Sequence, residues 1–127
     1  MEVPDELEML QALPVIANHV ETEDGVFLYD FQDASQTLLR LSFSIIARSI
    51  QTDLYVANRL LVSVCQEGAI FLRLRQDKEG NSILLGEFGI TLHPAQASAR
   101  EKLEVQFYPQ ILVNWSTLWD IDYGQLN

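Results

Sequence analysis

Residues 39–45 read LRLSFSI, and this stretch decides the fold class. Its apolar residues alternate with Arg40, Ser42 and Ser44. Successive side chains of a strand point to opposite faces, so this alternation indicates an antiparallel strand with one buried and one exposed face. The same pattern recurs at 26–31, 50–56, 70–75, 88–92, 103–107 and 111–115. We therefore expect a mainly β fold, with α+β left open: about seven to eight strands in an antiparallel, strongly curved sheet or a sandwich.

One or two short helices should accompany the strands. Asp5 can cap a helix over residues 6–13, which Pro14 ends. A second candidate runs over 94–101, because proline suits the first helical position and three alanines follow it. Residues 53–65 fit a strand or a helix, and their β-branched residues favour the strand.

Glycines and aromatic residues predict further local features. Asp24-Gly25 is a strong hairpin signal, and the strand after it places Phe27, Tyr29 and Phe31 on one face. Gly86 and Gly89 are expected to mark a β-bulge. The last dozen residues are expected to form a covering segment or a loose tail.

Composition predicts a single domain over residues 1–127 with an acidic N-terminal segment at 1–33. The chain has 127 residues, is 48% hydrophobic and carries a net charge of −10. This charge makes nucleic acid and anionic membranes unsuitable direct partners. The single cysteine, Cys65, excludes an internal disulfide, and its apolar neighbours predict a buried thiol. The acidic start and the lack of a long apolar run predict a cytoplasmic protein.

The acidic residues are concentrated at the start of the chain. Residues 1–33 hold nine acids and no lysine or arginine, while the remaining 94 residues hold nine acids and eight bases. Nearly all of the net charge therefore belongs to the first quarter of the sequence. The nine early acids are Glu2, Asp5, Glu6, Glu8, Glu21, Glu23, Asp24, Asp30 and Asp33.

The sequence predicts no enzyme, and we expect no catalytic, cofactor-binding or metal-binding residues. The histidines are His19 and His93, and no G-x-S-x-G elbow accompanies them. The sequence contains no C-x-x-C, H-E-x-x-H, EF-hand or phosphate-loop motif. The acids at 21–24 lack the further ligands, at fixed spacing, that a calcium loop needs.

A concentrated acidic surface favours a basic protein as the partner, because clustered charge speeds encounter with an opposite charge. Nucleases and other toxins that act on nucleic acid have basic active sites. We therefore interpret the chain as a bacterial immunity or antitoxin protein that blocks a toxin domain by direct binding. The expected partner-binding residues are Glu21, Glu23, Asp24, Tyr29, Asp30 and Asp33.

Two other functions remain open at this point. The chain could be a secretion chaperone or assembly factor that holds an effector segment. It could also be a small ligand-binding protein or enzyme with a pocket lined by Trp115, Trp119 and Tyr108. The sequence leaves open whether the protein is a monomer or a homodimer.

Overall fold

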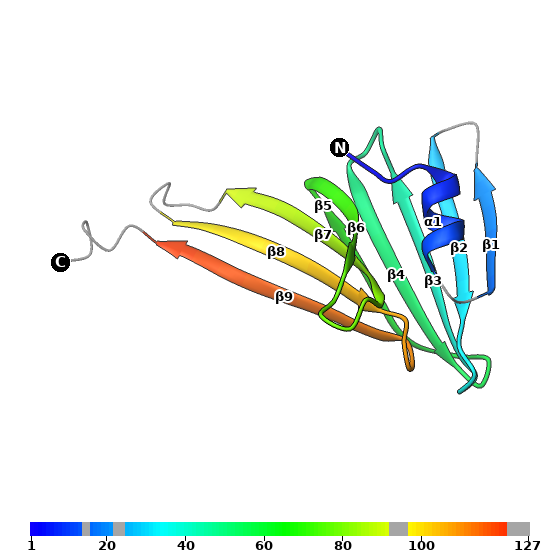
Figure 1. The fold of residues 1–127 in the computed structure, drawn as a ribbon. Coiled ribbons are helices and arrows are strands. Elements are labelled where there is room, and N and C mark those ends of the chain that lie inside the picture. The colour runs from blue at the N-terminus through cyan, green and yellow to red at the C-terminus, as the bar shows by residue number, and fades with distance from the viewer. Residues whose placement is uncertain (14–15, 22–24, 92–96, 122–127) are drawn as a thin grey trace.

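The computed structural model describes the backbone of residues 1–13, 16–21, 25–91 and 97–121, and the side chains of residues 1–13, 25–89 and 101–116. Strands dominate these residues, and one short helix precedes them (Figure 1). The predicted mainly β, antiparallel architecture is confirmed. The elements are α1 (Glu6–Ala12), β1 (Ile16–Glu21), β2 (Val26–Gln32), β3 (Thr37–Ser44), β4 (Ser49–Val56), β5 (Arg59–Glu67), β6 (Ala69–Gln76), β7 (Ser82–Thr91), β8 (Ala97–Gln106) and β9 (Leu112–Ile121).

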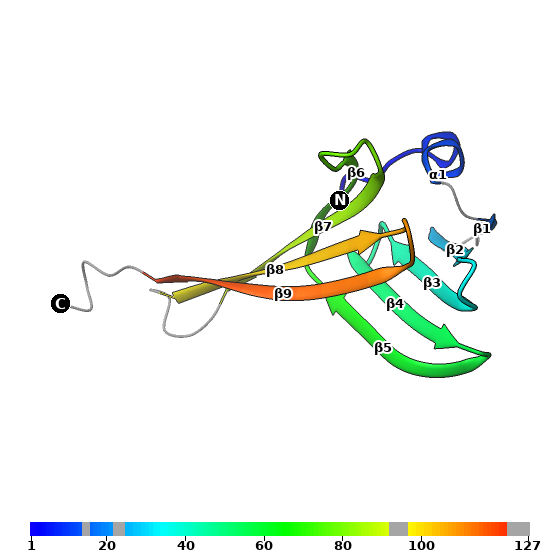
Figure 2. The ribbon, with the colours of Figure 1, turned by 60° about the horizontal axis from the view of Figure 1, so that its bottom comes forward.

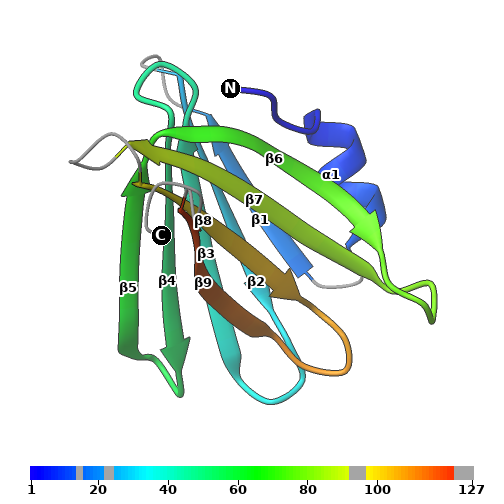
Figure 3. The ribbon, with the colours of Figure 1, turned by 90° about the vertical axis from the view of Figure 1, so that its left-hand side faces the viewer.

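The strands form two antiparallel meanders that face each other (Figures 2 and 3). The first sheet has the order β1-β2-β3-β4-β5 and the second the order β6-β7-β8-β9. The chain passes between the sheets at Gly68, whose φ is 84°. A Cβ at this position would lie 3.0 Å from the carbonyl oxygen of Gly89, so only glycine fits the corner.

The core lies between the sheets, as the alternating pattern predicts. Leu39, Leu41 and Phe43 of β3 are buried, while the intervening Arg40 is only partly buried. A hydrogen bond from Trp115 Nε1 to Thr52 Oγ1, 3.0 Å long, joins β9 to β4 across this core. The buried apolar side chains are Met9, Leu13, Tyr29, Phe31, Leu39, Leu41, Phe43, Ile50, Ala69, Leu72, Leu84, Phe88, Leu103, Val105, Phe107 and Ile111.

Helix α1 forms where the capping pattern predicts it. The Asp5 side chain accepts a hydrogen bond from the Glu8 backbone N–H at 2.8 Å, which satisfies one of the unpaired donors of the first turn. Met9 and Leu13 are buried in the core cluster that also contains Tyr29 and Phe31. The helix thus continues the second layer beyond β6 and covers the β1–β2 side of the first sheet (Figures 1 and 2).

Several local predictions are wrong. The helix predicted over 94–101 is contradicted at 97–101, which belong to β8 and pair with both β7 and β9; residues 92–96 lie outside the described residues. Two continuous ladders of backbone hydrogen bonds outweigh the helical preference of a few alanines. Residues 116–121 are part of β9 rather than a tail.

The region 53–65 is extended, as the favoured alternative predicts. β4 and β5 are joined by a two-residue turn, in which Ala57 and Asn58 have φ values of 49° and 65°. Cys65 is exposed rather than buried, because β5 is an edge strand with little packed against it. The β-bulge expected near Gly86 and Gly89 lies instead on the opposite strand, where the β6 register shifts between Ala69 and Phe71.

Gln36 occupies a turn position that suits glycine. The turns 33–37 and 77–81 share one geometry, with a backbone hydrogen bond from Asp33 to Thr37 and from Asp77 to Asn81. The fourth residue has a φ of 62° at Gln36 and 84° at Gly80. A non-glycine residue in the left-handed region destabilises the folded state by about 1 kcal/mol. Glycine removes this strain but gains more entropy in the unfolded state, which cancels part of the benefit.

We therefore expect Gln36→Gly to raise the free energy of unfolding by about 0.5 kcal/mol. Gly80→Ala is the matched reverse change, and it should lower the free energy of unfolding by about 0.5 kcal/mol. Urea denaturation measures both changes. A loss of stability in Gln36→Gly would contradict the claim that this backbone position is strained.

Candidate protein-binding surface

Two of the predicted contact residues have structural partners of their own. Asp30 accepts hydrogen bonds from Arg40 Nε at 2.8 Å and Arg40 Nη2 at 3.0 Å, which makes a two-point ion pair across β2 and β3. The hydrogen bond to Asp30 raises the pKa of Arg40. Asp30 therefore carries a neutralised charge on the outer face of the first sheet.

Asp33 connects the two sheets. Its Oδ1 accepts hydrogen bonds from the backbone N–H groups of Ser35 at 2.8 Å and Thr37 at 3.1 Å, which shape the β2–β3 turn. Its Oδ2 accepts one from Ile111 at 2.8 Å, in the β8–β9 connection of the second sheet. Burial alone would raise the pKa of Asp33, but the hydrogen bonds from Ile111, Thr37 and Ser35 outweigh it and lower that pKa.

Tyr29 lies in the core. Its side chain is 1% exposed, and its ring stacks on Phe31 and Phe43 at centroid distances of 5.9 and 6.0 Å. A buried ring offers no surface to a partner, so its position argues against the partner-binding role expected for Tyr29. The alternation of β2 predicts this burial once the inner face is identified.

Of the remaining predicted contacts, the structure describes only the backbone of Glu21. Glu21 is the last residue of β1 and pairs with Phe27, while Glu23 and Asp24 lie outside the described residues. The hairpin is confirmed by the antiparallel pairing of its strands and by the φ of 74° at Gly25. The described residues therefore do not show the six predicted contact residues as a single cluster.

Helix α1 carries an acidic surface that the predicted contact set omits. Asp5, Glu6 and Glu8 are exposed around its first turn, beside Leu7, which is 63% exposed, and Leu10. A hydrogen bond with Asp5 and the negative charge of that residue raise the pKa of Glu8, as expected where carboxylates are crowded. The helical prediction and the charge count together could have identified this surface, which we call the α1 acidic surface.

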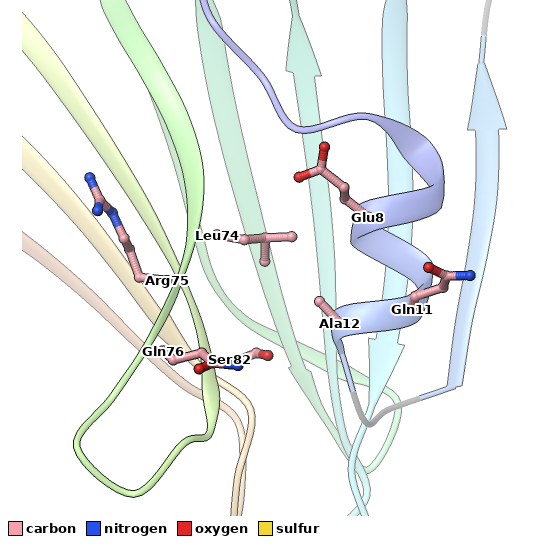
Figure 4. Close-up of a pocket in the computed structure, with 7 residues that line it drawn as sticks. All are labelled: Glu8, Gln11, Ala12, Leu74, Arg75, Gln76 and Ser82. Carbon is pink, nitrogen blue, oxygen red and sulfur yellow. The ribbon is translucent and has the colours of Figure 1, made fainter.

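A groove of about 520 Å³ separates α1 from the edge of the second sheet (Figure 4). Glu8, Gln11 and Ala12 line its helical side. Leu74, Arg75, Gln76 and Ser82 line its opposite side on β6 and β7. In Figure 4 the Leu74 side chain points toward the helix, whereas the Arg75 side chain points away from it. The acidic group that lines the groove is therefore Glu8.

The N-terminal segment is fixed along β6 at one end of this groove. Glu2 pairs with Phe71 as a parallel bridge, with backbone hydrogen bonds to Ile70 and Leu72. Arg73 donates two hydrogen bonds to the Glu2 carboxylate, at 3.1 and 2.9 Å, and its guanidinium lies 3.9 Å from the centre of the Phe71 ring. Hydrogen bonding to Arg73 lowers the pKa of Glu2.

Arginines of later strands thus neutralise part of the acidic segment. Residues 1–33 supply no base of their own, but Glu2 and Asp30 pair with Arg73 and Arg40 of later strands. A one-dimensional charge count cannot show cross-strand or terminal pairings. Asp5, Glu6 and Glu8 of the α1 acidic surface are exposed to solvent.

The described residues show no other recognisable chemical site. They contain no group of three or more His, Cys, Asp or Glu side chains arranged to hold a metal ion. Trp115 packs against Phe88 at a centroid distance of 5.5 Å, whereas Tyr108 is 60% exposed. Within this part of the chain, no helix is long and apolar enough to cross a membrane.

The fold resembles a known structure. No protein-family model matches the sequence, and no curated protein matches it significantly. A chain from the contact-dependent growth inhibition toxin–immunity protein complex of Klebsiella pneumoniae 342 superimposes with a TM-score of 0.76 and 19% sequence identity. The match covers 92% of this chain and 96% of the other, so the two chains share their fold over nearly their whole length.

Proposed function

We propose that this chain is an immunity protein that binds a toxin domain and blocks it. The observation that carries the proposal is the full-length likeness in fold to a chain of a toxin–immunity complex. The net charge of −10 and the α1 acidic surface support the immunity role, because an inhibitor must match the surface that it covers. The proposed complex forms in the cytoplasm of a bacterium.

The toxin that fits this surface is basic and of the nuclease type. An enzyme that binds phosphates needs lysine and arginine side chains in its active site. The carboxylates of Asp5, Glu6 and Glu8 can pair with such groups and exclude the nucleic acid. The exposed Leu7 and Leu10 supply apolar contact area within the same surface.

Co-expression tests this function directly. The candidate toxin is the product of the neighbouring open reading frame, produced in a bacterial host with and without this chain. The proposal predicts growth arrest without the chain, restored growth with it, and a complex with the folded toxin domain. An unrelated acidic protein of similar charge is the control. Persistent arrest, or binding only to an unfolded segment as a secretion chaperone would bind, would contradict the proposal.

The β1–β2 hairpin acids are a second expected part of the interface. Replacing Glu21, Glu23 and Asp24 together by serine should change the stability by less than about 0.5 kcal/mol per site, as is usual at surfaces. Association with the toxin domain should become slower and less sensitive to salt. Stopped-flow fluorescence measures both effects. Unchanged association would place the interface on α1 alone.

A further inference from the structure

β5 forms an exposed edge of the first sheet. In the sheet order it pairs with β4 on one side, and no described strand pairs with its other side. It is nine residues long and contains no lysine or proline, two of the usual means of protecting an edge, although it carries a bulge at Leu61. Its outer backbone groups are therefore available to another strand.

The side chains of β5 are apolar and exposed as well. Leu60, Leu61 and Val62 are 53%, 58% and 51% exposed, and the Cys65 thiol is exposed beyond them. Three consecutive apolar residues at this exposure are unusual for an edge strand that faces only water. Burial against a neighbouring strand would remove this surface from solvent.

The charges at the two ends of β5 indicate which neighbour fits. The strand begins at Arg59 and ends at Glu67, both exposed. A two-fold axis near Ser63 would run two copies of β5 antiparallel, so that Arg59 of each copy approaches Glu67 of the other. The β4–β5 register shifts at Leu61, which is an extra residue in β5. This bulge displaces Arg59 by one position along the paired strands, and the long Arg59 side chain can still reach Glu67 of the other copy.

The rest of the molecule is compatible with this arrangement. β5 and β1 are the two opposite edges of the first sheet, and α1 lies on the β1 side (Figure 3). The α1 acidic surfaces of two copies would thus lie far from the shared axis, where they repel each other least. The residues from 34 onward, which include β5, carry a net charge of only −1.

We propose that β5 pairs antiparallel with β5 of a second copy of this chain, joining the two five-stranded sheets into one continuous sheet across a homodimer. This inference is independent of the proposed function. It predicts a mass of twice 14.5 kDa for the full-length protein in light scattering and sedimentation velocity. A protein that stays monomeric up to about 100 µM would overturn it, because a dissociation constant above that concentration is weaker than that of most specific interfaces.

A charge swap tests the register. Arg59→Glu should weaken dimerisation by about ten-fold or more, because it places like charges together at both ends of the paired strands. The double variant Arg59→Glu with Glu67→Arg should restore the wild-type dissociation constant. Val62→Lys, which places a charge in the middle of the edge, should give a monomer.

Circular dichroism and thermal unfolding confirm that each variant is folded. A double variant as weak as the single one would overturn the antiparallel pairing of β5. A dimer that persists in Val62→Lys would place the dimer interface elsewhere. A monomeric wild-type chain, together with loss of toxin binding in Val62→Lys, would assign β5 to the toxin and overturn the homodimer.

Discussion

Replacing Asp33 by alanine should lower the free energy of unfolding by about 3 kcal/mol, because three backbone N–H groups lose an ionised acceptor. Two of these groups, on Ser35 and Thr37, shape one turn, and the third, on Ile111, belongs to the opposite sheet. Partial exposure lets water replace some of the lost bonds, so the estimate lies well below three full charge-assisted hydrogen bonds.

The turn at Asp77 provides a matched control. Asp77 Oδ1 accepts hydrogen bonds from the N–H groups of Glu79 and Asn81, both at 2.9 Å, in the same positions relative to the aspartate. No bond from the opposite sheet to Asp77 is seen among the described residues. Asp77→Ala should therefore cost about half as much as Asp33→Ala.

Asp33→Asn separates the local bonds from the long-range bond. The amide oxygen can still accept from Ser35 and Thr37, while its NH₂ group would face the N–H of Ile111. We expect a loss of about 1.5 kcal/mol from this single contact. Equal stabilities of Asp33→Ala and Asp77→Ala would contradict the claim that Asp33 joins the sheets.

The stability that Asp33 contributes should depend on pH. Its folded-state pKa is lowered, so the carboxylate is ionised more readily in the folded than in the unfolded chain. The contribution is therefore fully present above the unfolded pKa, about 4, and is lost as the pH falls through the lower folded value. Urea denaturation of wild type and Asp33→Ala at neutral pH and near pH 3 should show the difference shrinking in acid.

The second large effect concerns the α1 acidic surface. Replacing Glu6 and Glu8 together by glutamine should slow association with the toxin domain by about ten-fold at low salt, because it removes the charges that attract a basic site. Asp5 is kept, since its side chain caps the helix. Surface plasmon resonance or stopped-flow fluorescence at low ionic strength measures the rate.

The control for this change removes the same charge elsewhere. Glu79 follows Lys78 in the β6–β7 turn, and Glu104 lines a depression together with Lys102 and Arg75. Replacing Glu79 and Glu104 by glutamine should leave association nearly unchanged, because neither acid belongs to the α1 acidic surface. Equal slowing by both pairs would show that total charge, rather than the α1 acidic surface, governs binding.

The fold was largely predictable because its strands alternate. The pattern at Leu39, Leu41 and Phe43 follows directly from a strand with one buried face. The strand at 97–101 was missed because the helical preference of alanine was given more weight than the alternation of Ala95, Ala97 and Ala99 with polar residues. The ladders to β7 and β9 decide for the strand. Local propensity cannot report such tertiary pairing.

The candidate surface was predictable only in part. The charge count located the acids in the first quarter of the chain, but it could not show that Arg40 and Arg73 would neutralise Asp30 and Glu2. It also could not separate Asp33, which binds backbone N–H groups of both sheets, from acids that face solvent. These distinctions depend on contacts between residues far apart in the sequence.

The rate of association with the adjacent toxin domain, measured against salt concentration, tests the account most directly. An acidic surface that binds a basic site predicts a rate near 10⁸ M⁻¹s⁻¹ at low salt, falling by about 100-fold as salt screens the charges. A rate of about 10⁵–10⁶ M⁻¹s⁻¹ that does not change with salt, or the absence of a complex, would contradict it.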